Sequence, residues 1–356
     1  MSDGRILLNS WACFFVHFCI EIICFTVLTH TFGVSGLVQF FLYMAFDIIA
    51  FYPQFIVGVI HERFPKLDIP TISVAIMAVG LLILQFDKSS VRSMIAVGVI
   101  ALGNAFLHDC CAIQTTLIGK GKLFPAALYV SGGSFGVVLG QIFGRSQYAS
   151  KWCLFIVLLI MWGLLLFTNS SWLIKDYVYP KYDLVKKDSK YSYWIVVFAA
   201  YFVTFVRSFM GYAIPISWKK STWQAILLFF IMGLGKALGG YLTDKFGAKK
   251  VGIISTLISI PFLICGKDMM VVSIIGVFFF SMTMSITFGM FLSVIPKNPG
   301  VAFGLTTLAL GNGIMVPFAF GDLGFVVNVI LIVVLSILCA IILGFTLKGD
   351  KERSSV

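Results

Sequence analysis

Charged residues are scarce in this sequence, which argues against a soluble protein, because the surface of a soluble protein needs many charged side chains. Asp, Glu, Lys and Arg make up 12% of the 356 residues, whereas hydrophobic residues make up 60%. No hydrophilic stretch is long enough to fold as a soluble domain. The sequence also lacks a P-loop, a nucleophile elbow and a zinc-protease signature, so ATP-driven transport and hydrolysis have no support. We therefore expect neither an enzyme nor a bound cofactor.

Acidic residues are fewer than basic ones, at 15 against 26. The net charge of +11 would suggest a nucleic-acid partner for a soluble protein. Here the basic residues fall mostly between apolar runs, so we expect a lipid bilayer and no nucleic acid. With the N-terminus inside, most Lys and Arg fall in cytoplasmic loops, which places both termini in the cytoplasm. We expect a monomeric, multi-pass protein of the cell (inner) membrane.

Apolar runs long enough to cross a bilayer recur along the chain. A spanning segment needs about 20 apolar residues, and its backbone polar groups need partners within the segment, which favours helices. The eight cysteines lie almost wholly inside these runs, so we expect no disulfide framework. The fold class predicted is an all-α membrane protein with twelve transmembrane helices. The predicted spans are 6–29, 34–60, 69–86, 92–118, 123–144, 152–173, 193–215, 222–243, 249–265, 269–295, 299–320 and 323–347.

The longest hydrophilic stretch, residues 174–192, divides the spans into six and six. We predict an N-terminal six-helix bundle over 1–173, a cytoplasmic linker over 174–192 and a C-terminal six-helix bundle over 193–356. A related phrase follows the second span of each half, GVIHERFPKL at 58–67 and GYLTDKFGAKK at 240–250. Each has a Gly, three residues, an acid, a base and an aromatic. Recurrence at matching positions indicates duplication of a six-helix unit.

The second phrase resembles the loop signature of the major facilitator superfamily, G-x-L-A-D-R-x-G-R-K. Asp244 can accept hydrogen bonds from a neighbouring helix N-terminus while Lys245 and Lys249 stay at the headgroups. The resemblance implies two pseudo-symmetric bundles, a charge latch that makes and breaks during alternating access, and a substrate held between the halves. Glu62 and Arg63 would take the equivalent places in the first half. The matching positions are Gly240, Leu242, Asp244, Lys245, Gly247 and Lys249, while Ala248 replaces the usual Arg.

Five further segments resemble, in order, the fosmidomycin-resistance-type efflux transporters. In that family a His lies four residues before an acid in the first helix, and Asp109 stands where it usually has Pro. The resemblance implies export of a small compound. The segments are HFCIE (17–21), ERFP (62–65), GNAFLHD (103–109), GKLFPAALYVSGGSFGVVLG (121–140) and VRSFMG (206–211).

Seven ionisable side chains lie within the predicted spans, where a charge at mid-bilayer costs roughly 2.5–3.5 kcal/mol. Such residues are expected to face a cavity or a partner. The acids all lie in the N-terminal half, and the Lys and Arg lie in the C-terminal half. The seven are His17, Glu21, Asp47, His108, Asp109, Arg207 and Lys236.

Glu21 is the first candidate for a proton site, followed by Asp47 and Asp109. Because His17 and Glu21 are four residues apart, they share one helix face. Burial makes a carboxyl easier to protonate, and imidazole titrates nearest neutrality, so His17 or His108 could relay the proton. Each acid could instead form a structural hydrogen bond or a helix-to-helix ion pair.

Basic side chains in the C-terminal half suggest an anionic substrate group. Arg207 can bind a phosphonate, phosphate or carboxylate through two hydrogen bonds, and Lys236 adds a point charge. Arg207 could instead pair with Glu21 or Asp47 across the cavity as a gate. The tenth span adds hydroxyls among Phe and Met side chains, which suits a partly apolar substrate. The substrate-binding candidates are Arg207, Lys236, Asn104, Ser281 and Thr283.

Glycines at four-residue spacing are typical of close helix contacts. The fifth span has Gly132, Gly136 and Gly140, and the eighth has Gly235 and Gly239. We predict that they form the sliding contact between the two halves.

The predicted function is a proton-coupled secondary transporter that exports a small amphipathic or anionic organic compound. Uptake of an organic anion or nutrient by the same fold is the main alternative. Cys110 and Cys111, beside His108 and Asp109, raise a transition-metal exporter as a further alternative. Consecutive helix residues point about 100° apart, so at most two or three of these could face one ion, and we expect no metal site.

Overall fold

The computed structural model describes residues 3–31, 37–85, 91–168, 179–186, 192–321 and 323–349. Within these ranges the regular secondary structure is helical, apart from one isolated β-bridge, and short turns and loops connect the helices. The helices are α1 (Asp3–Thr31), α2 (Leu37–Phe51), α3 (Pro53–Arg63), α4 (Ile69–Ile83), α5 (Val91–Ile118), α6 (Phe124–Arg145), α7 (Lys151–Thr168), α9 (Ser192–Ala213), α10 (Thr222–Phe246), α11 (Ala248–Cys265), α12 (Met270–Ser281), α13 (Thr283–Val294), α14 (Pro299–Phe320) and α15 (Phe325–Thr346).

Eleven helical segments of the described chain are long and apolar enough to cross a membrane. Two of them are interrupted, the α2–α3 segment at Tyr52 and the α12–α13 segment at Met282. Pro53 explains the first break, because proline lacks the N–H that continues a helix. The shorter apolar helix α4, with 15 residues, completes the set of twelve. The predicted all-α, twelve-span fold class is confirmed.

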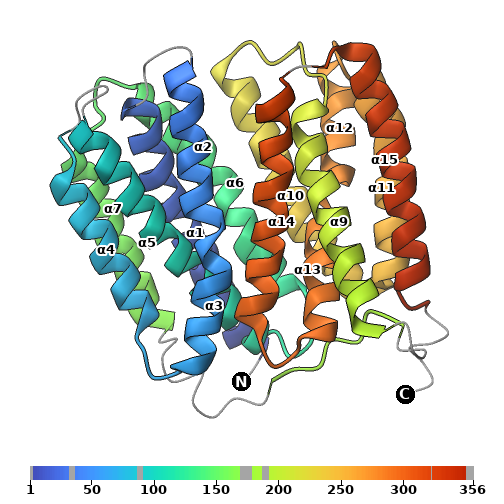
Figure 1. Cartoon of the computed structure of the whole chain (residues 1–356), viewed down its shortest axis with the longest axis horizontal. Helices are drawn as coiled ribbons and strands as arrows, with labels where there is room; N and C mark the ends of the chain where they lie inside the picture. The colour runs from blue at the N-terminus through green and yellow to red at the C-terminus, as the bar shows by residue number, and fades with distance from the viewer. Residues whose placement is uncertain are drawn as a thin grey trace.

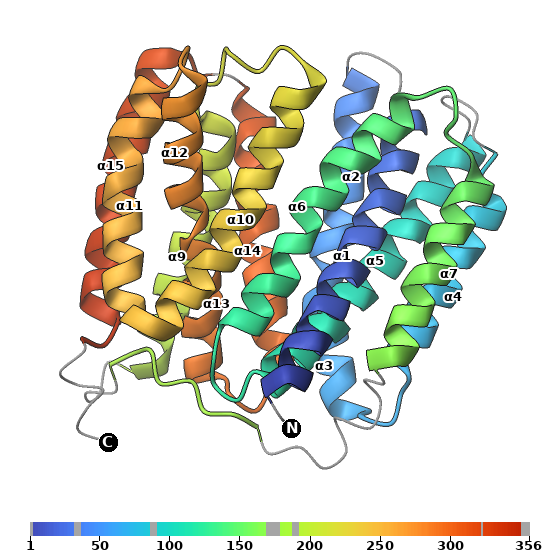
Figure 2. The same cartoon turned by 180° about the vertical axis from the view of Figure 1, so that it is seen from behind.

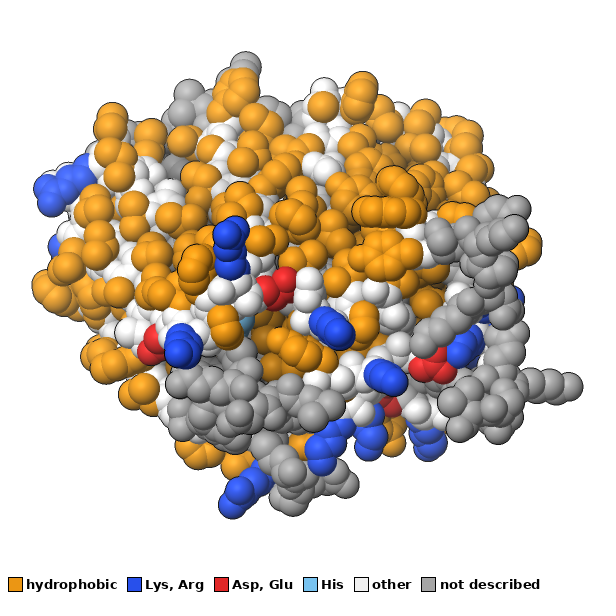
Figure 3. Space-filling view, turned by 60° about the horizontal axis from the view of Figure 1, so that its bottom comes forward, with side chains coloured by type: hydrophobic (Ala, Val, Ile, Leu, Met, Phe, Trp, Pro, Cys, Tyr) orange, Lys and Arg blue, Asp and Glu red, His pale blue; other side chains and the backbone are white. Residues whose placement is uncertain are grey.

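The helices form two groups that lie side by side, α1–α7 and α9–α15 (Figures 1 and 2). The start of α1 and the end of α15 lie at the same end of the bundle, which we call the terminal end (Figure 1). Basic side chains gather on this end (Figure 3). The exposed ones are Arg5, Arg63, Lys66, Lys120, Lys122, Lys181, Lys245, Lys250 and Lys297.

Glycines bring helices together within each half. A Cβ on Gly132 or Gly136 would lie 2.3 or 2.4 Å from a carbonyl oxygen of α1. A Cβ on Gly235 or Gly239 would lie 2.5 or 2.3 Å from a carbonyl oxygen near the α12–α13 break. Our prediction that these glycines form the sliding contact between halves is therefore wrong. These glycines instead allow close contact with the backbone of another helix in the same half.

The two halves contact each other mainly through α6 with α10 and through α2, α3 and α5 with α14, and α6 also contacts α13. At the terminal end, a Cβ on Gly58 would lie 2.5 Å from the carbonyl carbon of Gly300, so only glycine permits this approach. Further along α14, the Asn312 side chain accepts a hydrogen bond from Tyr52 Oη and donates one to Tyr201 Oη. These contacts join helices of both halves.

Residues 179–186 of the predicted linker bind both halves at the terminal end. Tyr182 Oη donates to Thr116 O of α5 at 3.0 Å. Val185 pairs with Leu347 in the isolated antiparallel bridge, and Lys348 Nζ lies 2.6 Å from the Asp183 carboxylate oxygens. This segment therefore ties the end of α15 to the N-terminal half. Residues 174–178 and 187–191 of the predicted linker lie outside the described residues.

Candidate functional site

Three ionisable side chains meet between α1 and α5. His17, Glu21 and His108 are buried, with 7%, 8% and 8% of their surfaces exposed. Glu21 Oε1 lies 3.5 Å from His17 Nε2 and 3.2 Å from His108 Nε2. The two Nε2 atoms are 2.8 Å apart. We call these three residues the His-Glu cluster.

Backbone carbonyls fix the outer nitrogen of each imidazole. His17 Nδ1 lies 3.0 Å from Tyr129 O, and His108 Nδ1 lies 3.0 Å from Asn104 O. Because a carbonyl oxygen only accepts, each Nδ1 carries the hydrogen and each neutral Nε2 carries a lone pair. Two lone pairs facing each other at 2.8 Å repel, whereas a proton between them forms a hydrogen bond. The cluster therefore suits one shared proton, whose charge the Glu21 carboxylate offsets.

The same cluster offers the ligand atoms of a metal site. One ligand atom from each of the three residues lies within 4.8 Å of the others, and two imidazoles with a carboxylate are a ligand set for zinc. Tetrahedral zinc with Zn–N bonds of about 2.0–2.1 Å separates two ligand nitrogens by about 3.3 Å. The Nε2 atoms are closer, at 2.8 Å. The spacing thus fits a proton better than a metal ion. In the described chain, Cys110 and Cys111 do not join this group.

Tyr129 of α6 links the cluster to the opposite half. Its ring lies 4.8 Å from the His17 ring, and its hydroxyl donates to His108 O at 3.0 Å. On its other side the ring lies 6.3 Å from the ring of Phe303 on α14. No sequence pattern indicated this role, because an isolated aromatic in an apolar span is usually a packing residue.

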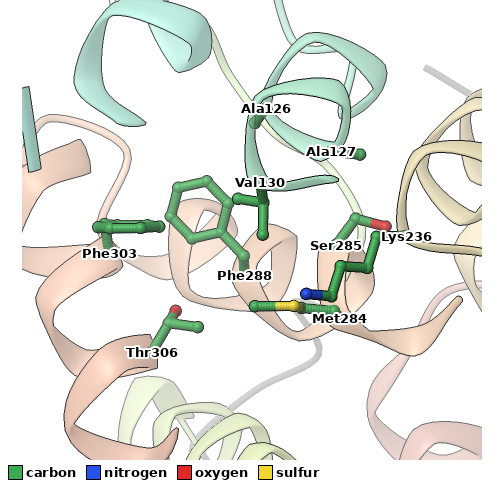
Figure 4. Close-up of a pocket in the computed structure, with 9 residues that line it drawn as sticks. All are labelled: Ala126, Ala127, Val130, Lys236, Met284, Ser285, Phe288, Phe303 and Thr306. Atoms are coloured by element: carbon green, nitrogen blue, oxygen red, sulfur yellow. The ribbon is translucent and has the colours of Figure 1, made fainter. Parts of the chain in front are cut away.

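A pocket lies where α6 and α10 meet α13 and α14. Its empty space is about 310 Å³, open solvent included. Lys236 supplies the charge in this lining, and its amino group extends toward Met284 (Figure 4). The Lys236 Nζ donates to Ser134 Oγ at 2.8 Å and is close enough to interact electrostatically with Arg207 and Glu21. The lining residues are Ala126, Ala127, Val130, Lys236, Met284, Ser285, Phe288, Phe303 and Thr306.

Arg207 is buried at the break between α12 and α13. Its Nε and Nη2 donate to the carbonyl oxygens of Phe280 and Ser281, each at 3.3 Å. These carbonyls end α12, where the helix dipole is negative, so the guanidinium caps that helix. Among the described residues no acid forms an ion pair with Arg207. The pairing with Glu21 or Asp47 considered from the sequence is thus not formed in this conformation.

The other predicted substrate-binding residues lie outside the pocket lining. Asn104 holds His108 through its backbone carbonyl. Ser281 and Thr283 flank the α12–α13 break, and Thr283 Oγ1 donates to Phe280 O at 3.3 Å. Of the predicted substrate residues, the structure brings Lys236 into the pocket, with Arg207 close by.

Asp244 accepts two backbone hydrogen bonds from the other half. Its carboxylate oxygens lie 2.8 Å from the backbone nitrogens of Leu123 and Phe124, at the N-terminus of α6. Such a contact is what a latch between the halves requires. Lys245 is exposed and lies over the Phe246 ring at 5.2 Å. Lys249, at the start of α11, is half-buried.

The first phrase is not built like the second. Glu62 has a buried Oε1 without a hydrogen-bond partner, and Arg63 is exposed. Neither forms a bond between the halves in the described part of the chain. Their role as a second latch stays a prediction.

The two remaining acids lie apart from the His-Glu cluster. Asp47 on α2 is half-buried and interacts electrostatically with Glu21 and with Tyr212 of α9. Asp109 is fully buried beside Gly300 of α14. It adjoins His108 in sequence, yet the helical turn directs it toward a different neighbour.

Comparisons with solved structures identify the fold. No protein-family model and no curated protein matches the sequence. The fold is similar to a structure of the E. coli fucose:proton symporter FucP, with 14% identity, a TM-score of 0.66, and 96% of this chain and 98% of that chain covered. It is also similar to the major facilitator superfamily transporter FucP in the outward conformation, with 14% identity, a TM-score of 0.56, and coverage of 93% and 98%. The chain thus shares the fold of these two structures, at 14% identity to each.

Proposed function

We propose that this chain is a proton-coupled transporter of a small amphipathic organic anion, working as a monomer by alternating access in the cell (inner) membrane. The His-Glu cluster is the observation that carries the proposal, because its two Nε2 atoms lie at a distance that suits a shared proton. The exposed basic side chains at the terminal end favour a cytoplasmic location for that end and for both termini.

The pocket supports an anion with an apolar body. Lys236 offers one ammonium group for one anionic group, and Ser285 and Thr306 add hydroxyls. The remaining walls are apolar, and the rings of Phe288 and Phe303 meet edge to face at 5.5 Å. A ligand pocket of this kind combines apolar walls with a few placed polar groups.

Electrostatics favours binding of the proton and the anion together. Without the shared proton, the His-Glu cluster carries the negative charge of Glu21, which attracts Lys236. A proton on the imidazole pair neutralises the cluster and leaves Lys236 available to an anion. By linkage, the bound anion in turn strengthens proton binding. When the proton and the anion bind together, they cross the membrane in the same direction. A proton gradient directed into the cell then drives uptake of the anion.

Export in exchange for protons is the second candidate. Its support is the resemblance to fosmidomycin-resistance-type efflux transporters, in which a His precedes an acid by four residues, as His17 precedes Glu21. Exchange requires that the substrate and the proton exclude each other. The two candidates therefore differ in the sign of proton movement on ligand binding.

A ligand screen followed by a proton measurement tests the proposal. Purified protein is screened by thermal shift against carboxylates, phosphonates, lipophilic cations and divalent metals, because a ligand of the folded state raises apparent stability. A stabilising anion is then added in weak buffer with a pH indicator. Proton uptake on binding supports cotransport, and proton release supports exchange. Stabilisation by metals alone, or no proton movement, contradicts the proposal.

A further inference from the structure

Asp109 is a buried carboxyl outside the His-Glu cluster. Its exposed surface is 0%, and neither carboxyl oxygen has a hydrogen-bond partner within the described chain. An unpaired carboxylate in such surroundings costs several kcal/mol, and the group takes up a proton instead. The Asp109 carboxyl is therefore neutral in this conformation.

The cover over Asp109 comes from the other half of the molecule. A Cβ on Gly300 of α14 would lie 3.0 Å from Asp109 Oδ2 and 2.9 Å from Gly58 Cα of α3. Glycine at both positions lets the α3 and α14 backbones touch above the carboxyl. The burial of Asp109 thus depends on contact between the halves at the terminal end.

The titratable groups closest to Asp109 on the covering elements lie on α3. Glu62 on α3 interacts with it electrostatically as a like charge. On the same helix His61 is buried with no hydrogen-bond partner for either ring nitrogen, and Arg63 is exposed. Helix α14 has no titratable residue along its length. Beside Glu62, burial and the Glu62 charge raise the pKa of Tyr179 in the linker segment.

We infer that Asp109 is a second proton-binding site, separate from the His-Glu cluster, which binds its proton as the α3–α14 contact closes and releases it as that contact opens. On opening, water reaches the carboxyl, and its O–H bond breaks to give a carboxylate and a hydrated proton. On closing, the carboxylate takes a proton back from water. The terminal end therefore closes only when the Asp109 carboxyl carries a proton, which it takes from the water at that end. This role rests on the proposed function only in that the halves separate during transport.

Distance measurements between the halves test this site. Lys66→Cys and Lys297→Cys place spin labels at two exposed positions on opposite halves beside the contact, with the exposed Cys153 and Cys265 replaced by Ala. Pulsed EPR in nanodiscs then gives the open-to-closed ratio between about pH 5 and pH 9. One linked proton raises this ratio by up to about tenfold per pH unit.

Asp109→Asn supplies a neutral, isosteric side chain at every pH. We expect the terminal end of this variant to stay closed. The pH dependence of its open-to-closed ratio should correspond to one proton fewer than in the wild type. Asp68→Asn is the matched control, since Asp68 is an exposed acid at the same end and Asn also caps a helix. That control should keep the wild-type pH dependence.

A second variant changes the part of α14 that covers Asp109. Gly300→Ala places a methyl group against Asp109 Oδ2 and Gly58, so we expect an open terminal end with little pH dependence. Unchanged pH dependence in Asp109→Asn, or a Gly300→Ala protein that closes as the wild type does, overturns the second site and leaves the proposed function standing. A terminal end that opens in no variant at any pH contradicts both.

Discussion

Replacing Asp244 by Asn should release the terminal end. The carboxylate oxygens accept the N–H groups of Leu123 and Phe124, both at 2.8 Å. Hydrogen bonds to charged groups contribute about 1.5–3 kcal/mol each, and a carboxylate at a helix N-terminus adds about 0.3–1 kcal/mol. Asn keeps one acceptor oxygen but loses the charge and the second bond. We expect the contact to weaken by about 2–3 kcal/mol.

A loss of this size raises the open-to-closed ratio by about 30- to 150-fold. Pulsed EPR between labels at positions 66 and 297 reports the ratio directly. Lys245→Gln is the neighbouring control, because Lys245 is exposed and contacts the Phe246 ring of its own half. An Asp244→Asn ratio within about threefold of the wild type would refute the reasoning that these two bonds hold the halves together.

Three further substitutions test the pocket and the packing. Lys236→Gln should weaken binding of the stabilising anion by about 10- to 150-fold in calorimetry, as expected for loss of a charged hydrogen bond, and unchanged affinity would remove Lys236 from the site. Arg207→Gln keeps donors for the two carbonyls at the α12–α13 break, so affinity should fall less than in Lys236→Gln, and a larger fall would reverse that ranking. Gly136→Ala should lower stability by about 1–3 kcal/mol, because its Cβ would lie 2.4 Å from an α1 carbonyl oxygen. Gly163→Ala, with nothing within 4 Å, should not lower the melting temperature, so equal melting temperatures would contradict the packing argument.

The architecture could be predicted because the bilayer constrains it strongly. Every spanning run must satisfy its own backbone, so apolar length alone located the helices. Breaks inside a span were harder to place. Tyr52 interrupts one at Pro53, but Met282 interrupts another without a proline beside it.

The site was predictable only where one helix determines it. Four-residue spacing placed His17 beside Glu21, but the contact with His108 depends on the relative register of α1 and α5, which no local pattern encodes. The glycine pattern showed the same limit. It indicated close backbones correctly, yet small residues serve contacts within a half as well as between halves.

Coupling by the His-Glu cluster is tested most directly with reconstituted protein and the stabilising anion. Wild-type proteoliposomes with an imposed pH gradient should accumulate the labelled anion above equilibrium. Glu21→Gln removes the negative charge that holds a proton on the imidazole pair, so gradient-driven accumulation should be lost while exchange of labelled for unlabelled anion continues. Accumulation by Glu21→Gln to the wild-type level would contradict a proton site at His17, Glu21 and His108.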